Sequence, residues 1–248
     1  MTPPPSTLTH HPSTINPQPL TITPPSPVPR ILSSLLVAAT LWFLMFSPWT
    51  ASYFNFWYAM TASALILTAL AWLFGGLRWP RMSVRDWCLT AVLGAGIAAL
   101  LWCVFWVGDK LSQWMFDFAR PQVDLIYGMK TGNAPWLLSL LLLFIIGPAE
   151  ELFWRGYVQQ SLVWYMMRRY RRMPKARAAR KAKNWAYILA TAAYTLVHLP
   201  SGNFMLIMAA LVCGLAWGGL YRLMPRQLPA IVISHALWDA AAFVWFPL

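Results

Sequence analysis

The chain has 248 residues, of which 59% are hydrophobic and 10% are charged, and its net charge is +12. A soluble domain needs more charged surface than this composition offers, so an ordinary soluble globular protein is excluded. The positive charge does not indicate a nucleic-acid partner, because nine basic residues lie together within 168–183, between two apolar runs. That placement is typical of a cytoplasmic loop of a membrane protein, close to anionic lipid headgroups.

The N-terminal segment has a composition of its own. Residues 1–29 contain ten of the twenty prolines and could not build a hydrophobic core. We therefore predict a disordered Pro-rich tail over 1–29. A cleavable signal peptide has a short basic start before its apolar segment, whereas here roughly thirty mostly uncharged residues come first. The first apolar run is accordingly expected to be an uncleaved anchor.

The rest of the chain consists of long apolar runs, most of them long enough for a membrane-spanning helix of roughly 17–25 residues. The runs are continuous and lack the alternation of barrel strands, which favours helices. The sequence therefore predicts an all-α fold, a polytopic helical membrane protein with about seven transmembrane helices in one membrane domain over 30–248. The expected spans are 31–48, 54–77, 87–108, 134–166, 185–199, 204–224 and 228–246.

Two segments need separate treatment. The run 134–166 is too long for one crossing, and Gly147-Pro148 is expected to bend or break it because Pro removes a helix hydrogen bond. Its second half is expected to span, to lie along the inner interface or to re-enter. The segment 109–133 carries charges of both signs and predicts a non-cytoplasmic loop, with an interfacial helix around the sequence SQWMFDF.

The basic residues also predict an orientation. If the N-terminus is inside, the inside segments carry 15 of the 19 Lys and Arg residues, and the outside segments carry Lys110, Arg120 and Lys130. Loops rich in Lys and Arg stay on the cytoplasmic side. We therefore expect a cytoplasmic N-terminus, a cytoplasmic 168–183 segment and a location in the cell inner membrane.

Small residues in the apolar runs have structural interpretations. Cys88, Cys103 and Cys213 show no paired spacing and are interpreted as packing residues, not as a disulfide framework. Gly214 and Gly218 lie four residues apart in one apolar run, followed by Gly219, which favours close approach of a neighbouring helix.

Ionisable residues inside the predicted spans are the main functional signal. Four such groups at the membrane centre would cost about 10–14 kcal/mol on insertion scales, which compares with the whole stability of a domain, about 5–15 kcal/mol. Each residue alone could be a packing histidine or an internal ion pair, but a structural role for all is a poor explanation of that cost. The residues are Glu150, Glu151, Arg155, His198, His235 and Asp239.

Their spacing predicts that they converge. Glu151 and Arg155 are i, i+4 and can pair on one helix face. Glu150 is rotated by about 100° from Glu151 and should point elsewhere. Three helices would then bring polar groups to a comparable depth. Two further i, i+4 pairs are Tyr194 with His198, and His235 with Asp239.

These residues resemble the motifs of a known family. EELFWR (150–155) resembles the Glu-Glu-x-x-x-Arg motif of the CPBP family, the CAAX-protease and bacteriocin-processing membrane proteins, also called the Abi family. YTLVH (194–198) is similar to its Phe-x-x-x-His motif with Tyr in the Phe place, and HALWD (235–239) to its His-x-x-x-Asn or Asp motif. The resemblance covers about 134–246. It implies an intramembrane glutamate endopeptidase, similar to type II CAAX prenyl endopeptidases, with a water-filled cavity that opens toward the cytoplasmic side.

The implied activity suggests a role for each catalytic candidate. Glu150 would be the general base for a water molecule, because a carboxylate in an apolar site is a better proton acceptor. His198 would hold that water and later pass a proton to the leaving amine. Glu151 with Arg155 would balance charge and fix the first helix. His235 would donate to the oxygen that becomes negative in the tetrahedral intermediate.

Two positions depart from the usual family pattern. Asp239 stands where an Asn could donate directly, and an ionised Asp only accepts. It would orient His235 and favour the charged imidazole, or else stay protonated. Tyr194 places a hydroxyl where the family usually has none, and it is a candidate substrate-binding residue.

The expected partners are a peptide or protein substrate, which could be lipidated or membrane-bound, and membrane lipids, with no cofactor and no metal. Three alternatives stay open. The Glu, His and Asp side chains are adequate zinc ligands, which would give a zinc-dependent membrane protease, although no His-Glu-x-x-His helix is present. Intramembrane carboxylates and histidines also build transporter proton relays, although no sequence repeat is evident. The third alternative is a catalytically silent family member acting as a membrane scaffold or immunity factor.

Overall fold

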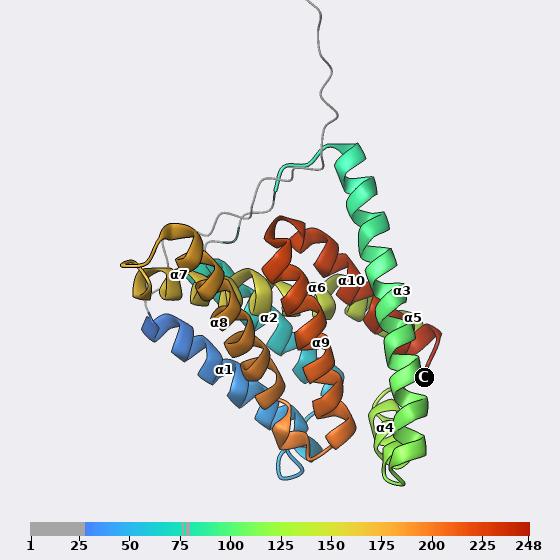
Figure 1. Cartoon of the computed structure of the whole chain (residues 1–248). Helices are drawn as coiled ribbons and strands as arrows, with labels where there is room; N and C mark the ends of the chain where they lie inside the picture. The colour runs from blue at the N-terminus through green and yellow to red at the C-terminus, as the bar shows by residue number, and fades with distance from the viewer. Residues whose placement is uncertain (1–27, 76, 78–79) are drawn as a thin grey trace, which may run out of the picture.

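The computed structural model describes residues 28–75, 77 and 80–248, so nearly all of the predicted Pro-rich tail lies outside the described residues. The described residues form helices and no strand, which confirms the all-α class (Figure 1). The helices are α1 (Val28–Phe46), α2 (Phe56–Gly75), α3 (Val84–Met115), α4 (Ala119–Gly128), α5 (Pro135–Leu141), α6 (Gly147–Glu151), α7 (Gln160–Arg169), α8 (Lys175–Leu196), α9 (Phe204–Leu223) and α10 (Leu228–Ala240).

Within the described ranges, six helices are long and apolar enough to cross a membrane, against the expected seven or so. The chain is an integral membrane protein. The difference lies at 185–199, because α8 begins at Lys175 and its first turns carry basic residues, so its apolar part is short. The six are Val28–Phe46, Phe56–Gly75, Val84–Met115, Pro135–Arg169, Phe204–Leu223 and Pro225–Trp245.

The long fourth run is not broken at Gly147-Pro148. It stays helical from Pro135 to Arg169, through two wider π-helical segments, Leu142–Ile146 and Leu152–Gln159. The Gly147 N–H donates to the Leu142 carbonyl five residues back. A π-helical turn of this kind lets a helix absorb a locally changed hydrogen-bond register, and Pro148 then lies in the first turn of α6, where a proline is tolerated.

The expected loop at 109–133 is largely helical. The third span continues to Met115, so the sequence SQWM forms its last turn, and the separate helix of this region is α4 instead. At its other end α3 begins with a capping box, in which Ser83 and Asp86 satisfy each other's backbone N–H groups. Because α3 is longer than expected, Asp109 is a buried helical residue.

The loops between the helices gather at two opposite ends of the molecule. At one end, which we call the α4 end, Trp57 at the start of α2 donates to the Met129 carbonyl (2.9 Å), and Asn203 before α9 donates to the Gln122 carbonyl (2.8 Å). Trp245 joins the same end through Ser139 (3.0 Å). The loops 47–55 and 199–203 therefore lie beside the segment 116–134, which contains α4.

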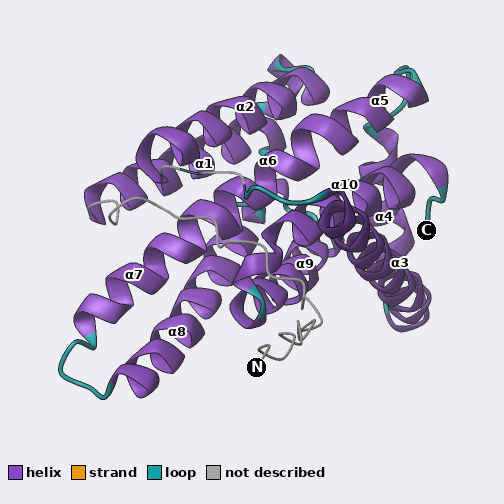
Figure 2. Cartoon of the chain, turned by 90° about the horizontal axis from the view of Figure 1, so that it is seen from above, coloured by secondary structure: helices purple, strands orange, loops and turns teal. Residues whose placement is uncertain are grey.

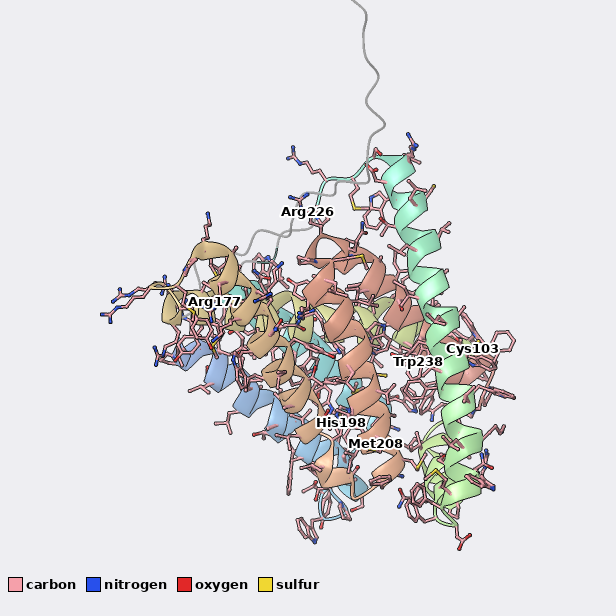
Figure 3. All side chains as sticks on the ribbon, viewed as in Figure 1. Cys103, Arg177, His198, Met208, Arg226 and Trp238 are labelled. Carbon is pink, nitrogen blue, oxygen red and sulfur yellow. The ribbon has the colours of Figure 1, made fainter. Side chains whose placement is uncertain are left out.

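The opposite end, which we call the basic end, holds the loop between α7 and α8, the start of α1 and the turn between α9 and α10. Arg222 at the end of α9 donates to Asn184 of α8 (2.8 Å), and Tyr221 donates to Gln160 of α7 (2.9 Å). Figure 2 shows α7 and α8 as a pair joined by a short loop, away from α3. In Figure 3 Arg177 and Arg226 lie toward this end, and His198 and Met208 toward the other.

Glycines set how closely the site helices approach. A Cβ at Gly147 would lie 2.7 Å from the Ala236 Cα, so α6 and α10 touch through their backbones. A Cβ at Gly214 would lie 3.0 Å from a Thr191 methyl group, and one at Gly218 would lie 3.2 Å from the Tyr187 ring. The close helix approach predicted for α9 is therefore confirmed, and its partner is α8.

Candidate active site

The two glutamates of EELFWR have different partners. Glu151 Oε1 accepts a hydrogen bond from Arg155 Nη1 at 2.8 Å, and both side chains are buried, at 0% and 2% exposure. The predicted i, i+4 pair is confirmed. Arg155 also donates to the Cys213 carbonyl (3.4 Å), and its guanidinium lies over the Tyr194 ring at 4.8 Å. One cation thus ties α8 and α9 to the motif helix.

His235 lies between two carboxylates. Its Nδ1 is 2.6 Å from Glu151 Oε1, and its Nε2 is 3.4 Å from Asp239 Oδ1. Ionised carboxylates only accept hydrogen bonds, so an imidazole with both nitrogens protonated satisfies both neighbours. The ring also stacks on Trp217, with centroids 3.8 Å apart and planes 21° from parallel.

Glu150 points away from this ion network, as predicted from helix geometry. Its Oε2 accepts a hydrogen bond from the Tyr194 hydroxyl at 2.8 Å, and the side chain is 7% exposed. Its other oxygen makes no hydrogen bond to the described residues. The Tyr194 hydroxyl, considered above as a substrate contact, is therefore directed at Glu150.

His198 has both ring nitrogens in use. Nδ1 is 2.8 Å from the Tyr194 carbonyl oxygen, which only accepts, so Nδ1 carries the proton and donates it. Nε2 then accepts from the Trp42 indole N–H at 3.2 Å. This arrangement fixes one neutral tautomer. As the structure holds it, His198 has no free nitrogen for a water molecule, in contrast to the role expected from the motif.

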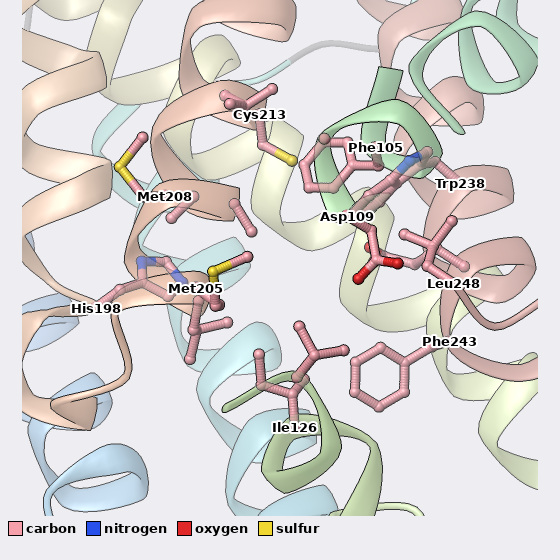
Figure 4. A pocket seen from close by; sticks show the side chains of 18 of the residues that line it. Phe105, Asp109, Ile126, His198, Met205, Met208, Cys213, Trp238, Phe243 and Leu248 are labelled. Carbon is pink, nitrogen blue, oxygen red and sulfur yellow. The ribbon is translucent and has the colours of Figure 1, made fainter. Parts of the chain in front are cut away.

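A single cavity of about 610 Å³ connects the predicted residues. Glu151 and Arg155 do not line it and lie behind its wall. The other lining groups are mostly apolar, and Figure 4 shows His198 on one side of the cavity and Trp238 and Phe243 on the other. The predicted site residues that line the cavity are Glu150, Tyr194, His198, His235 and Asp239.

The cavity lies toward the α4 end of the molecule. Its walls include the last turns of α3 from Gly108 to Phe116, α4 from Val123 to Tyr127, and α9 from Phe204 to Cys213. The basic segment 168–183 lies at the other end. A cytoplasmic basic segment and a cavity opening toward the cytoplasm were both expected, whereas the cavity lies toward the end of the molecule opposite the basic segment.

Three residues of the site were missed. Trp42 holds His198 from α1, and nothing in the sequence separates it from the chain's other tryptophans. Trp217 stacks on His235 and donates to Ser234 (3.1 Å), and only the small residues of its helix were interpreted from the sequence. Asp109 lines the cavity and accepts from Lys110 (3.0 Å) and from Gln113 at i+4 (2.6 Å). The i, i+4 spacing of Asp109 and Gln113 would have predicted this pair if the third span had been expected to continue past residue 108.

A zinc-dependent protease would need several His, Cys, Asp or Glu side chains close enough together to bind one metal ion. Within 28–75, 77 and 80–248, no group of three or more His, Cys, Asp or Glu side chains is placed so that it could hold a metal ion.

Comparison with known proteins gives one match. Residues 132–241 match a protein-family model described as type II CAAX prenyl endopeptidase Rce1-like. The comparison with curated proteins and that with solved structures each gave no match. The matched segment contains all three motifs, from Glu150 to Asp239, and agrees with the resemblance expected over about 134–246.

Proposed function

We propose that this chain, which matches a type II CAAX prenyl endopeptidase Rce1-like family model over residues 132–241, is a membrane endopeptidase in which Glu150 activates the hydrolytic water. The observation that carries the proposal is the division of labour between the two glutamates. Glu151 is held by Arg155 and His235 behind the cavity wall, whereas Glu150 lines the cavity and, among the described residues, accepts its hydrogen bond from the neutral Tyr194 hydroxyl. A carboxylate without a bound cation keeps its capacity to accept a proton.

The first step is attack of water on the substrate carbonyl. Glu150 takes one water proton while the water oxygen forms a bond to the carbonyl carbon, and the carbonyl oxygen becomes the oxyanion. His235 lines the cavity, and its Nε2 makes only a long contact with Asp239, 3.4 Å. We assign this N–H as the donor to the oxyanion, with Glu151 fixing the ring through Nδ1.

The second step is release of the amine. The tetrahedral intermediate collapses, the C–N bond breaks, and the leaving nitrogen takes the proton that Glu150 received. Glu150 returns this proton because both nitrogens of His198 are already engaged by Trp42 and Tyr194. His198 is then a positioning residue. Its hydrogen bond to the Tyr194 carbonyl fixes the helical turn whose Tyr194 hydroxyl donates to Glu150. No step is routed through a metal ion.

The test is a peptide-cleavage screen with purified full-length protein in detergent, comparing wild type with Glu150→Gln. Loss of the base should lower kcat by about 10²–10⁴-fold. Asp124→Asn is the matched control. It also replaces a carboxylate by an amide, but in an exposed ion pair with Arg120, so it should leave the rate unchanged. Equal cleavage by wild type and Glu150→Gln would remove Glu150 from the base role.

Two further arms separate the alternatives. A chelator should leave cleavage intact, and loss of activity that zinc restores would favour the metalloprotease. If wild type cleaves no peptide while Glu150→Ala keeps the protein's full effect in cells, the chain acts as a scaffold or immunity factor through partner binding.

A further inference from the structure

We infer that the proposed active site opens on the non-cytoplasmic side of the membrane, so that its substrate is an apolar polypeptide segment presented at the outer interface. The inference rests on the proposed function and adds to it the side from which substrate arrives and the character of that substrate. It joins two independent features of the molecule, the position of the cavity and the distribution of charge.

The cavity extends from the site toward the α4 end. The lining residues nearest the basic end are those of the site itself, Glu150, Cys213 and His235. From there the walls continue through the last turns of α3 and the first turns of α9 to Phe116 and Phe204. None of the described residues in the loops of the basic end lines the cavity. A substrate that enters this cavity therefore enters from the α4 end or from the side between α3 and α9, whose residues line it.

The two ends differ sharply in charge. The described residues of the basic end include Arg30, Arg81, Arg85, Arg222, Arg226 and the nine bases of 168–183. The α4 end carries three bases, Lys110, Arg120 and Lys130, against three aspartates. Two of those bases are neutralised locally, Lys110 by Asp109 at 3.0 Å and Arg120 by Asp124 at 2.7 Å.

This asymmetry orients the chain. Short loops rich in Lys and Arg stay on the cytoplasmic side, and the anionic inner leaflet attracts them further. The basic end is therefore cytoplasmic, and the α4 end, with its balanced charges, is the translocated one. Because the cavity lies toward the α4 end, it lies in the translocated half of the membrane domain.

The lining indicates what the cavity accepts. Several apolar side chains on its walls are well exposed, including Val104 and Leu111 of α3 and Phe204 and Met208 of α9. Such an apolar wall favours apolar side chains on both sides of the scissile bond. We therefore assign the substrate as an extended apolar segment anchored in, or inserted from, the outer leaflet.

The first experiment measures sidedness without reference to activity. In a Cys88→Ser/Cys103→Ser background, Thr131→Cys places a thiol at the exposed α4 end and Ala176→Cys places one in the exposed basic segment. A membrane-impermeant maleimide should label Thr131→Cys in intact spheroplasts and Ala176→Cys only after permeabilisation. The reverse labelling pattern would overturn the inference.

The second experiment measures access of substrate. The probe is a quenched fluorescent peptide with an apolar centre and a charged tag that prevents it from crossing a membrane. Right-side-out vesicles holding wild-type protein should cleave it directly, and inside-out vesicles only after detergent. Cleavage by sealed inside-out vesicles would contradict the inference. Failure of the detergent-solubilised protein to cleave would instead count against the proposed function, and the labelling result would still decide the side.

Discussion

Residues of the same type have different tasks here because their partners differ. Glu151 shares one oxygen between Arg155 and His235, and Asp239 faces the other nitrogen of His235. Arg155, a protonated His235 and the two carboxylates thus form a largely buried set whose charges cancel. Such a set contributes little net stability when complete, but removal of one member leaves an uncompensated charge in an apolar interior.

A double-mutant cycle tests this set. Arg155→Met should destabilise the protein by about 3–5 kcal/mol, because it leaves Glu151 short of a partner at a fully buried position. The double variant Glu151→Gln/Arg155→Met should recover part of that loss. Unfolding in mixed detergent micelles measures both.

The exposed pair Arg120 and Asp124 is the control for that cycle. Both side chains are about half exposed, and a surface pair of this kind contributes about 0–1 kcal/mol. If Glu151 and Arg155 gave strictly additive losses, the buried set would not be coupled in the way the geometry indicates.

Trp42 gives the second residue-scale prediction. Trp42→Phe keeps an aromatic ring in a fully buried position but removes the N–H that occupies His198 Nε2. We expect thermal stability to fall and kcat to change by less than about tenfold, because the proposed proton return runs through Glu150. A loss as large as that of Glu150→Gln, at equal protein recovery, would show that the fixed tautomer of His198 is itself required for the reaction.

At the scale of elements, the spacing of residues within one helix predicted several contacts correctly, whereas the hydrogen-bond pattern of the long fourth helix was not predicted. The Glu151–Arg155 pair, the separate direction of Glu150 and the glycine approach of α9 were all predicted from 3.6-residue periodicity, and all three are observed, the first of them although Arg155 lies in a π-helical segment. The π-helical segments on both sides of α6 were not predicted, because hydropathy does not distinguish i+4 from i+5 hydrogen bonds. The uninterrupted helix from Pro135 to Arg169 depends on them.

Gly147 tests the contact that places α6 against α10. A Cβ there would lie 2.7 Å from the Cα and 2.9 Å from the backbone N of Ala236, the residue after His235. Neither backbone atom can move aside alone, so Gly147→Ala should separate the two helices and cost about 1–3 kcal/mol. Cleavage should fall with it, because His235 would leave Glu151.

Gly96 of α3 is the matched control for Gly147. A Cβ at Gly96 meets nothing within 4 Å, so Gly96→Ala should be neutral or stabilising by about 0.5–1 kcal/mol, as expected for an open helical position. Equal stability and activity of the two alanine variants would show that the α6–α10 contact does not set the site.

At the scale of the whole molecule, the class was predictable and the three-dimensional enclosure was not. Composition and long apolar runs identified a helical membrane protein, and six rare ionisable residues indicated the site. The cavity, however, is closed by side chains from α1, α2, α3 and α4 that carry no motif. The contact of Trp42 with His198 joins residues 156 positions apart, and no local pattern encodes such a pairing.

Because the cavity depends on packing between distant helices, its role can be tested by filling it without touching the ionisable residues. Ala209 of α9 lines the cavity, and Ala209→Trp should occupy part of its 610 Å³. We expect kcat/KM for apolar peptides to fall by about tenfold or more, while thermal stability changes little because the cavity accommodates the ring. Leu215→Trp is the control, since Leu215 lies on the same helix, is 47% exposed and does not line the cavity. Unchanged kcat/KM in Ala209→Trp would mean that substrate reaches Glu150 by a route other than this cavity, and the sidedness inferred from its position would lose its basis.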